Sequence, residues 1–378
     1  MRILVDYRPA LRQRSGAGVF IHGLVHAYAR GPGRDDEVVL FSSSLRDQID
    51  PDDEPGFEIA NRRVPVRVLN RLWHRLEWPP VERLIGGSFD VVHSPHPLML
   101  PTRSAARVIT IHDLDFLDHP ERTEAEIRRD YPALVREHAL AADHIVVSSA
   151  FTAGEVHLRL DVPRHLITVC RPGAPPWPPR TAAPDGGPIL FVGTLEPRKN
   201  VSGLLDAYEL LLASSPRPVP ELLLAGRATR AAQPWLERLS QPPLKGHARH
   251  LGYVTDAERL ALFQRACLLV LPSFNEGFGL PVLEAMTLGV PVIASDRGAI
   301  PEVLGDAGVM VDPEAVDALA DAMGRMLVDP GAAAAAAARG IRRSRLFDWD
   351  EAATALRVAY TEAVAAHRAR QTAIAASR

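Results

Sequence analysis

The sequence has little of several features that define specialised protein classes. Its 378 residues include only two cysteines, Cys170 and Cys267, which excludes a disulfide scaffold and a cysteine-rich zinc module. The formal net charge is −3, whereas nucleic-acid-binding proteins are usually clearly basic, so no nucleic-acid partner is expected. No apolar stretch reaches the roughly 18 residues that a membrane span needs. The N-terminus lacks the apolar core of a signal peptide, and we therefore expect a cytoplasmic protein.

Proline, by contrast, is abundant, and its distribution divides the chain. The sequence contains 33 prolines, well above the average share of roughly 5%. Several lie in residues 171–188, where they prevent helix and central strand, so residues 173–188 are interpreted as a semi-rigid linker. Because one hydrophobic core stops growing at about 250–300 residues, two domains are expected. We assign them to residues 1–172 and 189–348, followed by a C-terminal helix at residues 349–378.

Both halves alternate short apolar runs with longer helical patterns, which is typical of parallel sheets covered by helices on both faces. The sequence therefore predicts an α/β protein with two Rossmann-like domains. In open parallel sheets ligands bind at the carboxyl ends of the strands, so facing domains would hold their ligand in a cleft between them. Strands are predicted at 3–6, 38–41, 91–93, 108–111, 145–148, 167–169, 189–192, 221–225, 268–271 and 291–294. Helices are predicted at 19–30, 124–142, 201–213, 256–265 and 281–288.

The segment PSFNEGFGLPVLEAMTLGVP, residues 272–291, carries the most chemistry. A glycine-rich loop follows the apolar strand and leads into a helix, and the free amides at a helix start favour an anion. Two carboxylates, Glu276 on the loop and Glu284 in the predicted first turn, would repel a phosphate but accept hydrogen bonds from hydroxyls. A sugar nucleotide offers both groups. Alternatively, Glu284 only complements the helix dipole.

A second segment, FVGTLEPRKN at residues 191–200, places Arg198 and Lys199 between a strand end and a helix start. Adjacent cations at the end of a parallel strand suit a diphosphate leaving group. The alternative is a solvated basic pair, although cations at a helix start oppose the helix dipole.

Other positions carry weaker signals. His112 follows a predicted strand on the ligand-binding side, but a single histidine is more often structural. His93 and His96 could line an acceptor region or be ordinary loop residues. Asp113 and Asp115 form a DxD pattern, which binds metal in some enzymes and also arises by chance.

Residues 61–84 include arginines at helical spacing, Arg67, Arg71 and Arg75, beside an apolar stripe. A basic amphipathic helix with tryptophan suits an anionic membrane surface or a phospholipid-linked acceptor. The alternative is a surface helix whose stripe packs in the core. The stripe consists of Val68, Leu69, Leu72, Trp73 and Leu76.

Three segments together resemble the retaining glycosyltransferases of the GT-B fold. They are GTLEPRKN, a strand ending in AGR, and the long stretch LGYVTDAERLALFQRACLLVLPSFNEGFGLPVLEAMTLGVPVIAS. The closest similarity is to family 4, whose E-x7-E motif would be Glu276 and Glu284. The resemblance covers almost the whole C-terminal half. The N-terminal half matches more loosely, through a strand, an SGxG loop and the IHD motif. The resemblance to this family implies two facing Rossmann-like domains and a last helix that crosses back to the first domain.

The resemblance also implies roles for single residues. Glu276 would bind the donor sugar's hydroxyls, Glu284 the ribose hydroxyls, and Lys199 with Arg198 the diphosphate, while His112 would lie near the donor sugar. Many relatives have Gly-Arg where this chain has Gly193-Thr194, so the diphosphate would depend more on Arg198 and Lys199. The implied donor contacts, many through the backbone, are Gly16, Ala17, Gly18, Gly193, Thr194, Tyr253, Val254, Gly277, Phe278, Gly279, Leu280 and Glu284.

The sequence thus predicts a retaining transfer of a hexose, with mannose favoured, from a nucleoside diphosphate sugar to an acceptor hydroxyl. GDP-mannose is the favoured donor and a UDP-sugar the alternative; the acceptor is a lipid-linked saccharide or a natural product. No metal or other cofactor is expected. The rival functions are a GT-B phosphorylase or epimerase and a non-catalytic sugar-nucleotide sensor. An NAD-dependent oxidoreductase is disfavoured, because no glycine-rich turn directly follows the first strand.

Overall fold

The computed structural model of the chain describes residues 1–11, 14, 16–45, 47–52, 54, 56–122, 125–182, 184 and 186–376. It divides into two compact units. The first comprises Met1–Asp118, Ala125–Gly173 and Asp348–Arg378, and the second comprises His119–Glu124 and Ala174–Phe347. Each unit is built around one parallel sheet, as the alternating sequence pattern predicts. Among the described residues, no helix has the length and apolar character needed to cross a bilayer.

The sheet of the first unit has seven parallel strands in the order β3-β2-β1-β4-β5-β6-β7. The inner strand β1 pairs on one side with β2 and on the other with β4, so that Leu4 lies opposite both Val39 and Val92. These side chains are buried, which agrees with the apolar runs that predict the strands. The strands are β1 (Arg2–Asp6), β2 (Glu37–Ser43), β3 (Glu58–Arg62), β4 (Val91–Ser94), β5 (Ala106–Ile111), β6 (His144–Val147) and β7 (Ile167–Val169).

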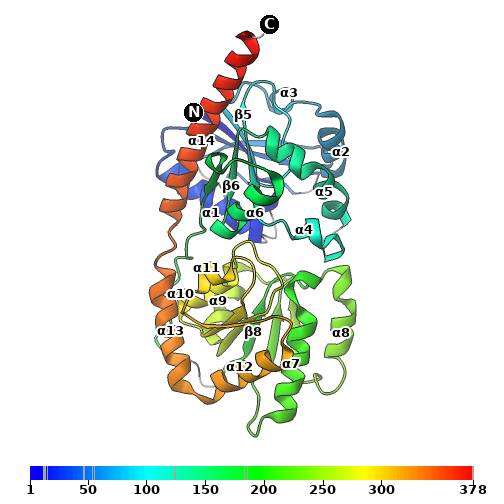
Figure 1. The fold of residues 1–378 in the computed structure, drawn as a ribbon, viewed down its shortest axis with the longest axis vertical. Coiled ribbons are helices and arrows are strands. Elements are labelled where there is room, and N and C mark those ends of the chain that lie inside the picture. The colour runs from blue at the N-terminus through cyan, green and yellow to red at the C-terminus, as the bar shows by residue number, and fades with distance from the viewer. Residues whose placement is uncertain are drawn as a thin grey trace. The chain divides into compact units, whose positions relative to one another are not determined.

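The last helix, α14 (Trp349–Ala376), belongs to the first unit although the second unit precedes it in sequence. It packs along α1 and against β5, β6 and β7 (Figure 1). Its fully buried Tyr360 bonds His93 Nδ1 at 2.8 Å, so the predicted crossing of the C-terminal helix is confirmed. The other helices of this unit are α1 (Gly16–Arg30), α2 (Val66–Leu76), α3 (Val81–Ile85), α4 (Asp115–Asp118), α5 (Ala125–Ala141) and α6 (Ala150–Leu160), with short 3-10 turns η1 (Arg8–Ala10) and η3 (Arg164–Leu166).

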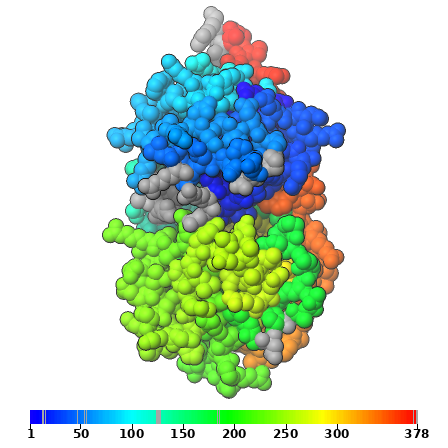
Figure 2. All heavy atoms as spheres, turned by 180° about the vertical axis from the view of Figure 1, so that it is seen from behind, coloured from blue at the N-terminus to red at the C-terminus, as the bar shows by residue number. Residues whose placement is uncertain are grey.

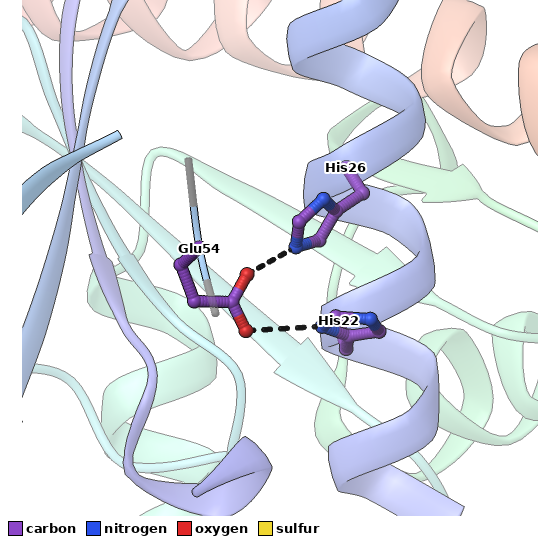
Figure 3. Close-up of side chains that lie close together, drawn as sticks. All are labelled: His22, His26 and Glu54. Atoms are coloured by element: carbon purple, nitrogen blue, oxygen red, sulfur yellow. Dashed lines mark hydrogen bonds and ion pairs between the residues drawn. The ribbon is translucent and has the colours of Figure 1, made fainter. Parts of the chain in front are cut away.

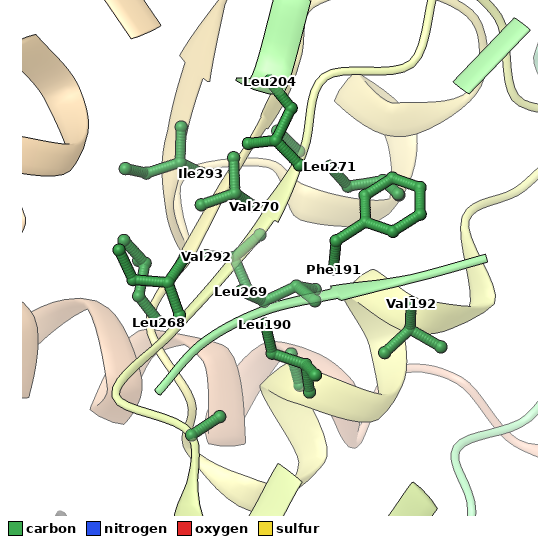
Figure 4. Packing of buried hydrophobic residues seen from close by; sticks show 14 of the residues in the cluster. Leu190, Phe191, Val192, Leu204, Leu268, Leu269, Val270, Leu271, Val292 and Ile293 are labelled. Carbon is green, nitrogen blue, oxygen red and sulfur yellow. The ribbon is translucent and has the colours of Figure 1, made fainter. Parts of the chain in front are cut away.

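The sheet of the second unit has six parallel strands in the order β10-β9-β8-β11-β12-β13. Helices cover both faces (Figure 1), and the residues of β8, β9, β11 and β12 are buried throughout. Figure 4 shows how closely these side chains pack. The strands are β8 (Ile189–Val192), β9 (Leu222–Ala225), β10 (Ala248–Gly252), β11 (Leu268–Leu271), β12 (Val292–Ser295) and β13 (Val309–Val311). The helices are α7 (Val201–Ser214), α8 (Gln233–Leu239), α9 (Asp256–Arg265), α10 (Leu280–Leu288), α11 (Ile300–Leu304), α12 (Val316–Val328) and α13 (Pro330–Ser344), with 3-10 turns η2 (Pro120–Arg122), η4 (Pro197–Lys199) and η5 (Arg230–Ala232).

One local prediction in the first unit is wrong. The expected glycine loop before residue 19 is instead the first turn of α1, which begins at Gly16. A Cβ at Gly18 would lie 2.3 Å from the Pro9 carbonyl oxygen, so this glycine lets α1 approach η1. The helix expected from the spacing of Arg67, Arg71 and Arg75 is present as α2, while the rest of the segment 61–84 contains the end of β3 and the start of α3.

Candidate functional site

The strand order of the second sheet reverses between β8 and β11. Strands β9 and β10 lie on one side of β8, while β11, β12 and β13 lie on the other. The chains that leave neighbouring strands at such a reversal diverge and form a crevice, which is where open parallel sheets bind ligands. The segment after β8 contains Gly193 and Lys199, and the segment after β11 contains Glu276 and Gly279. The sequence motifs therefore meet at the reversal point.

Glu276 and Lys199 form a buried ion pair across this point. Lys199 Nζ lies 2.6 Å from Glu276 Oε1 and 2.7 Å from Oε2, and Ser273 Oγ donates to Oε1 at 2.7 Å. Arg198 Nη1 lies 3.7 Å from Oε2 and donates to the Asn275 carbonyl at 3.0 Å. Burial by itself would raise the pKa of Glu276, but Lys199 and Arg198 hold that pKa below its ordinary value. The carboxylate is therefore ionised and its charge compensated.

Two glycines shape the backbone around Glu276. Gly279 is the N-cap of α10 with φ +103°, and a Cβ there would lie 2.6 Å from Ile300 Cδ1. Gly298 has φ +63°, and a Cβ there would lie 2.7 Å from the backbone nitrogen and oxygen of Glu276. Both positions require glycine. The Phe278 side chain is buried edge-on against Phe347, so this side chain is part of the core and does not face a ligand.

Glu284 lies in the second turn of α10, whereas the sequence predicts the first turn. It is buried, and Arg259 Nη2 lies 3.2 Å from its Oε1. Burial raises the pKa of Glu284 to about 7, and Arg259 opposes that rise. A carboxylate that only complements a helix dipole would lie in the exposed first turn. The position of Glu284 thus weakens the interpretation that it serves the helix dipole.

Arg259 is the site residue that the sequence analysis does not identify. It lies on α9, which begins with a capping box formed by Thr255 and Glu258. Its guanidinium also lies 3.2 Å from Asp256 Oδ1 and 5.9 Å from the centre of the Trp177 ring. The only signal in the sequence is the i, i+3 spacing from Asp256, which is typical of ordinary surface ion pairs.

The remaining predicted donor residues of this unit lie at the same edge of the sheet. Tyr253 and Val254 are half-buried between the end of β10 and the start of α9. Gly193 and Thr194 directly follow β8 and are also half-buried. A Cβ at Gly226 would lie 2.0 Å from the Gly193 carbonyl oxygen, so the glycine of the AGR sequence lets the chains after β8 and β9 approach closely.

The other predicted site residues belong to the first unit. His112 Nε2 lies 3.2 Å from the Pro95 carbonyl oxygen, its ring packs edge-on against Phe20, and burial lowers its pKa. Gly16 has open space where a Cβ would project, whereas Ala17 beside it is half-buried. Ser15 of the expected SGxG loop lies outside the described residues.

Two weaker sequence signals have structural explanations. His93 is fully buried between Tyr360 and Thr110, with 2.8 Å hydrogen bonds on both ring nitrogens, so it lines no acceptor region. Asp113 Oδ1 accepts from the Asp115 backbone nitrogen at 3.2 Å, which is a local turn at the start of α4.

Comparison with known proteins agrees with this geometry. The model of the family "Glycosyl transferases group 1" matches residues 187–329, and that of "Glycosyltransferase Family 4" matches residues 14–176. These matched ranges include the Lys199, Glu276 and Glu284 region and the α1 and His112 region, respectively.

A sequence relative leads to the same family, and two solved structures have the same fold. The chain is 34% identical to the O-antigen chain mannosyltransferase B of Escherichia coli over 276 residues, which cover 70% of this chain and 72% of that protein. Sucrose-phosphate synthase from Thermosynechococcus elongatus has the same fold, with a TM-score of 0.75 and 21% identity over 97% of this chain and 99% of that one. The fold is also that of Anabaena HepE, solved with UDP-glucose, with a TM-score of 0.65 and 18% identity over 94% and 97% of the two chains. The chain therefore belongs to glycosyltransferase family 4, with the GT-B fold.

Proposed function

We propose that this glycosyltransferase moves a hexose from a nucleoside diphosphate sugar to an acceptor hydroxyl with retention of configuration. The observation that carries the proposal is the buried Lys199–Glu276 pair at the reversal point of the second sheet, with Arg198 beside it. The pair presents a cation for phosphates and a carboxylate for hydroxyls within one site. A nucleoside diphosphate sugar carries both groups.

In this proposal the donor rearranges the ion pair. The diphosphate draws Lys199 and Arg198 toward its own charge, and Glu276 then accepts hydrogen bonds from hydroxyls of the sugar. As the bond to the sugar breaks, negative charge develops on the departing diphosphate, and the two cations with the amides at the start of α10 stabilise it. This stabilisation is greatest when water is excluded.

The proposed retention of configuration needs no covalent intermediate on Glu276. In this scheme the carboxylate accepts hydrogen bonds from Ser273 and, once the donor is bound, from hydroxyls of the sugar, so it does not act as a nucleophile. We propose instead that the departing phosphate takes the acceptor's proton, so that attack occurs on the face that the phosphate leaves. In this scheme His112, whose pKa burial lowers, is neutral and able to donate or accept a hydrogen bond.

The nature of the donor and acceptor rests on similarity. Mannose is favoured because the E. coli relative is a mannosyltransferase of O-antigen chains, and GDP-mannose is the corresponding donor. A UDP-sugar is the alternative, since Anabaena HepE is solved with UDP-glucose. A growing saccharide on a lipid carrier is the acceptor that we propose, by analogy with O-antigen chains.

Helix α2 supports contact with a membrane that carries such an acceptor. Leu69 and Trp73 are buried in the first unit, but Val68 and Leu76 are about half and two thirds exposed. The apolar stripe is thus divided between the core and the surface. The surface that includes residues around 70 faces the viewer in Figure 2. Exposed apolar groups among arginines suit the headgroup region of an anionic bilayer.

Substitution of Lys199 tests the central ion pair. We expect Lys199→Ala to lower turnover at least about a hundredfold, the scale of losing one transition-state stabiliser. The measurement is release of nucleoside diphosphate from GDP-mannose, with circular dichroism to verify the fold. Lys245, the only other lysine of the chain, is exposed and provides the matched control Lys245→Ala. Near wild-type turnover in both Lys199→Ala and Glu276→Ala would refute the proposed roles.

A thermal-shift panel tests the donor. A ligand that binds only the folded state raises the unfolding temperature, so we expect GDP-mannose to raise it more than UDP-glucose, UDP-N-acetylglucosamine or dTDP-glucose at equal concentration. A larger shift with a UDP-sugar would overturn the choice of GDP-mannose. Donor binding without hydrolysis or transfer to any acceptor would instead indicate a sensor.

The raised pKa of Glu284 predicts how donor affinity varies with pH. A carboxyl with a pKa of about 7 is mostly protonated at pH 6, whereas ribose hydroxyls that donate to it favour the ionised form. Donor binding then releases a proton, and we expect affinity to rise about tenfold from pH 6 to pH 8. Calorimetric titration of Glu284→Gln should give weaker binding at pH 8 and little dependence on pH. The exposed Glu314→Gln is the control, and an unchanged pH profile in Glu284→Gln would contradict the ribose role.

Membrane contact is tested by co-sedimentation with vesicles that contain anionic lipid. Each arginine near such a surface contributes about 1 kcal/mol, so we expect Arg71→Ala/Arg75→Ala to weaken binding at least about tenfold. Arg34, which is exposed on the same unit, provides the control Arg34→Ala. Equal binding of the double variant and the control would exclude α2 as the contact.

A further inference from the structure

Three side chains of the first unit converge at a place that the proposed transfer does not use. His22 and His26 lie one turn apart on α1, so both rings project from the same face of the helix. Glu54, from the segment between β2 and β3, points between them, as Figure 3 shows. The Glu54 side chain is only 3% exposed, whereas those of His22 and His26 are 29% and 19% exposed. The cluster is therefore built around a buried carboxylate and remains open to solvent on the histidine side.

The contacts within this cluster are as follows. His26 Nε2 bonds Glu54 Oε2. His22 Nδ1 lies 3.6 Å from Glu54 Oε1, which is too long for a hydrogen bond, and its partner is the Tyr7 hydroxyl at 2.5 Å. The Tyr7 hydroxyl donates to Glu54 Oε1 at 2.6 Å, and Arg14 Nη2 lies 3.2 Å from the same oxygen. Both imidazoles thus direct a ring nitrogen at one carboxylate.

Two imidazole nitrogens and one carboxylate oxygen form a donor set that suits Zn²⁺. One atom from each side chain lies within 4.8 Å of the other two. Ligands at about 2.0 Å from a tetrahedral ion lie about 3.3 Å apart, so small rotations of the side chains would bring all three into range. A magnesium or calcium ion would instead prefer a set of oxygen ligands. Among the described residues, this is the one group of three such side chains whose ligand atoms converge in this way.

We propose that His22, His26 and Glu54 bind one divalent transition-metal ion, with Zn²⁺ as the preferred ion. The Tyr7 hydroxyl contacts both His22 and Glu54, so it is placed to hold a water molecule in the fourth position. Arg14 would move aside, and its side chain, 28% exposed, has access to solvent. Three ligands and one open position are typical of sites that exchange a water molecule.

Such an ion would join two parts of the first unit. It would fix the segment that carries Glu54 to α1, whose first turn contains Gly16 and Ala17. The site would therefore stabilise α1, and it would take no part in the chemistry of Lys199 and Glu276. The inference does not depend on the proposed donor or mechanism, since it rests on other residues.

The test uses the full-length protein, freed of any affinity tag, stripped with a chelator and dialysed against Zn²⁺. We expect elemental analysis to find one zinc per chain and calorimetry to give micromolar or tighter binding. His26→Gln and Glu54→Gln should each weaken binding at least about a hundredfold, because removing a direct ligand should exceed the effect of losing an outer contact. His165, an exposed histidine of the same unit, provides the matched control His165→Gln, which should bind zinc like the wild type.

A measurement on the wild type keeps the inference testable if a variant fails to fold. Zn²⁺ should raise the unfolding temperature of the stripped protein, and Co²⁺ in its place should give the strong visible absorption of a four-coordinate site. Absence of both effects would overturn the proposal. Equal zinc binding by the wild type, His26→Gln and Glu54→Gln would also overturn it.

Discussion

The second unit depends on one electrostatic constraint, namely that the buried carboxylate of Glu276 must have cations beside it. An unpaired buried charge would be strongly destabilising, and a pair tolerates burial only when the geometry is close and further hydrogen bonds complete it. Lys199, Arg198 and Ser273 satisfy this condition. Because Lys199 follows β8 and Glu276 follows β11, the pair also ties together the two loops that diverge at the reversal of strand order. Lys199 and Glu276 hold the two loops together. In the proposed function the same two side chains bind the diphosphate and a sugar hydroxyl, respectively.

Much of the fold is predictable because the central strands are buried on both faces. Continuous apolar runs predict β1, β4, β5, β8, β9, β11 and β12 at nearly their observed bounds. Two of the strands at sheet edges are less apolar, although the edge strand β7, with the sequence ITV, is predicted at its observed bounds. Neither β3, with the sequence EIANR, nor β10, with ARHLG, has a continuous apolar run, and both escape prediction. Strand β13 is only three residues long. The edge strands β3 and β10 have a neighbour on one side only, and their mixed composition carries a weaker signal than that of the inner strands.

The site residues are predictable where the chemistry of a side chain and its position in the sequence point to the same ligand. They are less predictable where the packing of helices determines which side chains come together. Glu276 and Lys199 stand out as charged residues in the loops that follow apolar strands. Gly18, by contrast, belongs to an SGxG pattern that predicts a ligand-binding loop. In the structure its lack of a Cβ instead lets α1 approach Pro9. Arg259 is invisible to the sequence argument, because only the packing of α9 against α10 brings its guanidinium to Glu284. A sequence pattern records which groups are present, whereas helix packing decides which of them meet.

The two carboxylates of the E-x7-E motif differ in how the protein treats their charge. Both are buried, and burial by itself raises the pKa of each. Two cations reverse the effect at Glu276, whereas one arginine only moderates it at Glu284, whose pKa stays at about 7. Environments that separate the pKa values of two similar groups also separate their roles. Glu276 keeps its charge and holds its position through the ion pair, while Glu284 lies close enough to neutrality that a modest gain in hydrogen bonding from a ligand decides its protonation state. The motif therefore combines one carboxylate whose charge is compensated by cations with one whose pKa lies near 7, a difference that spacing in the sequence alone does not reveal.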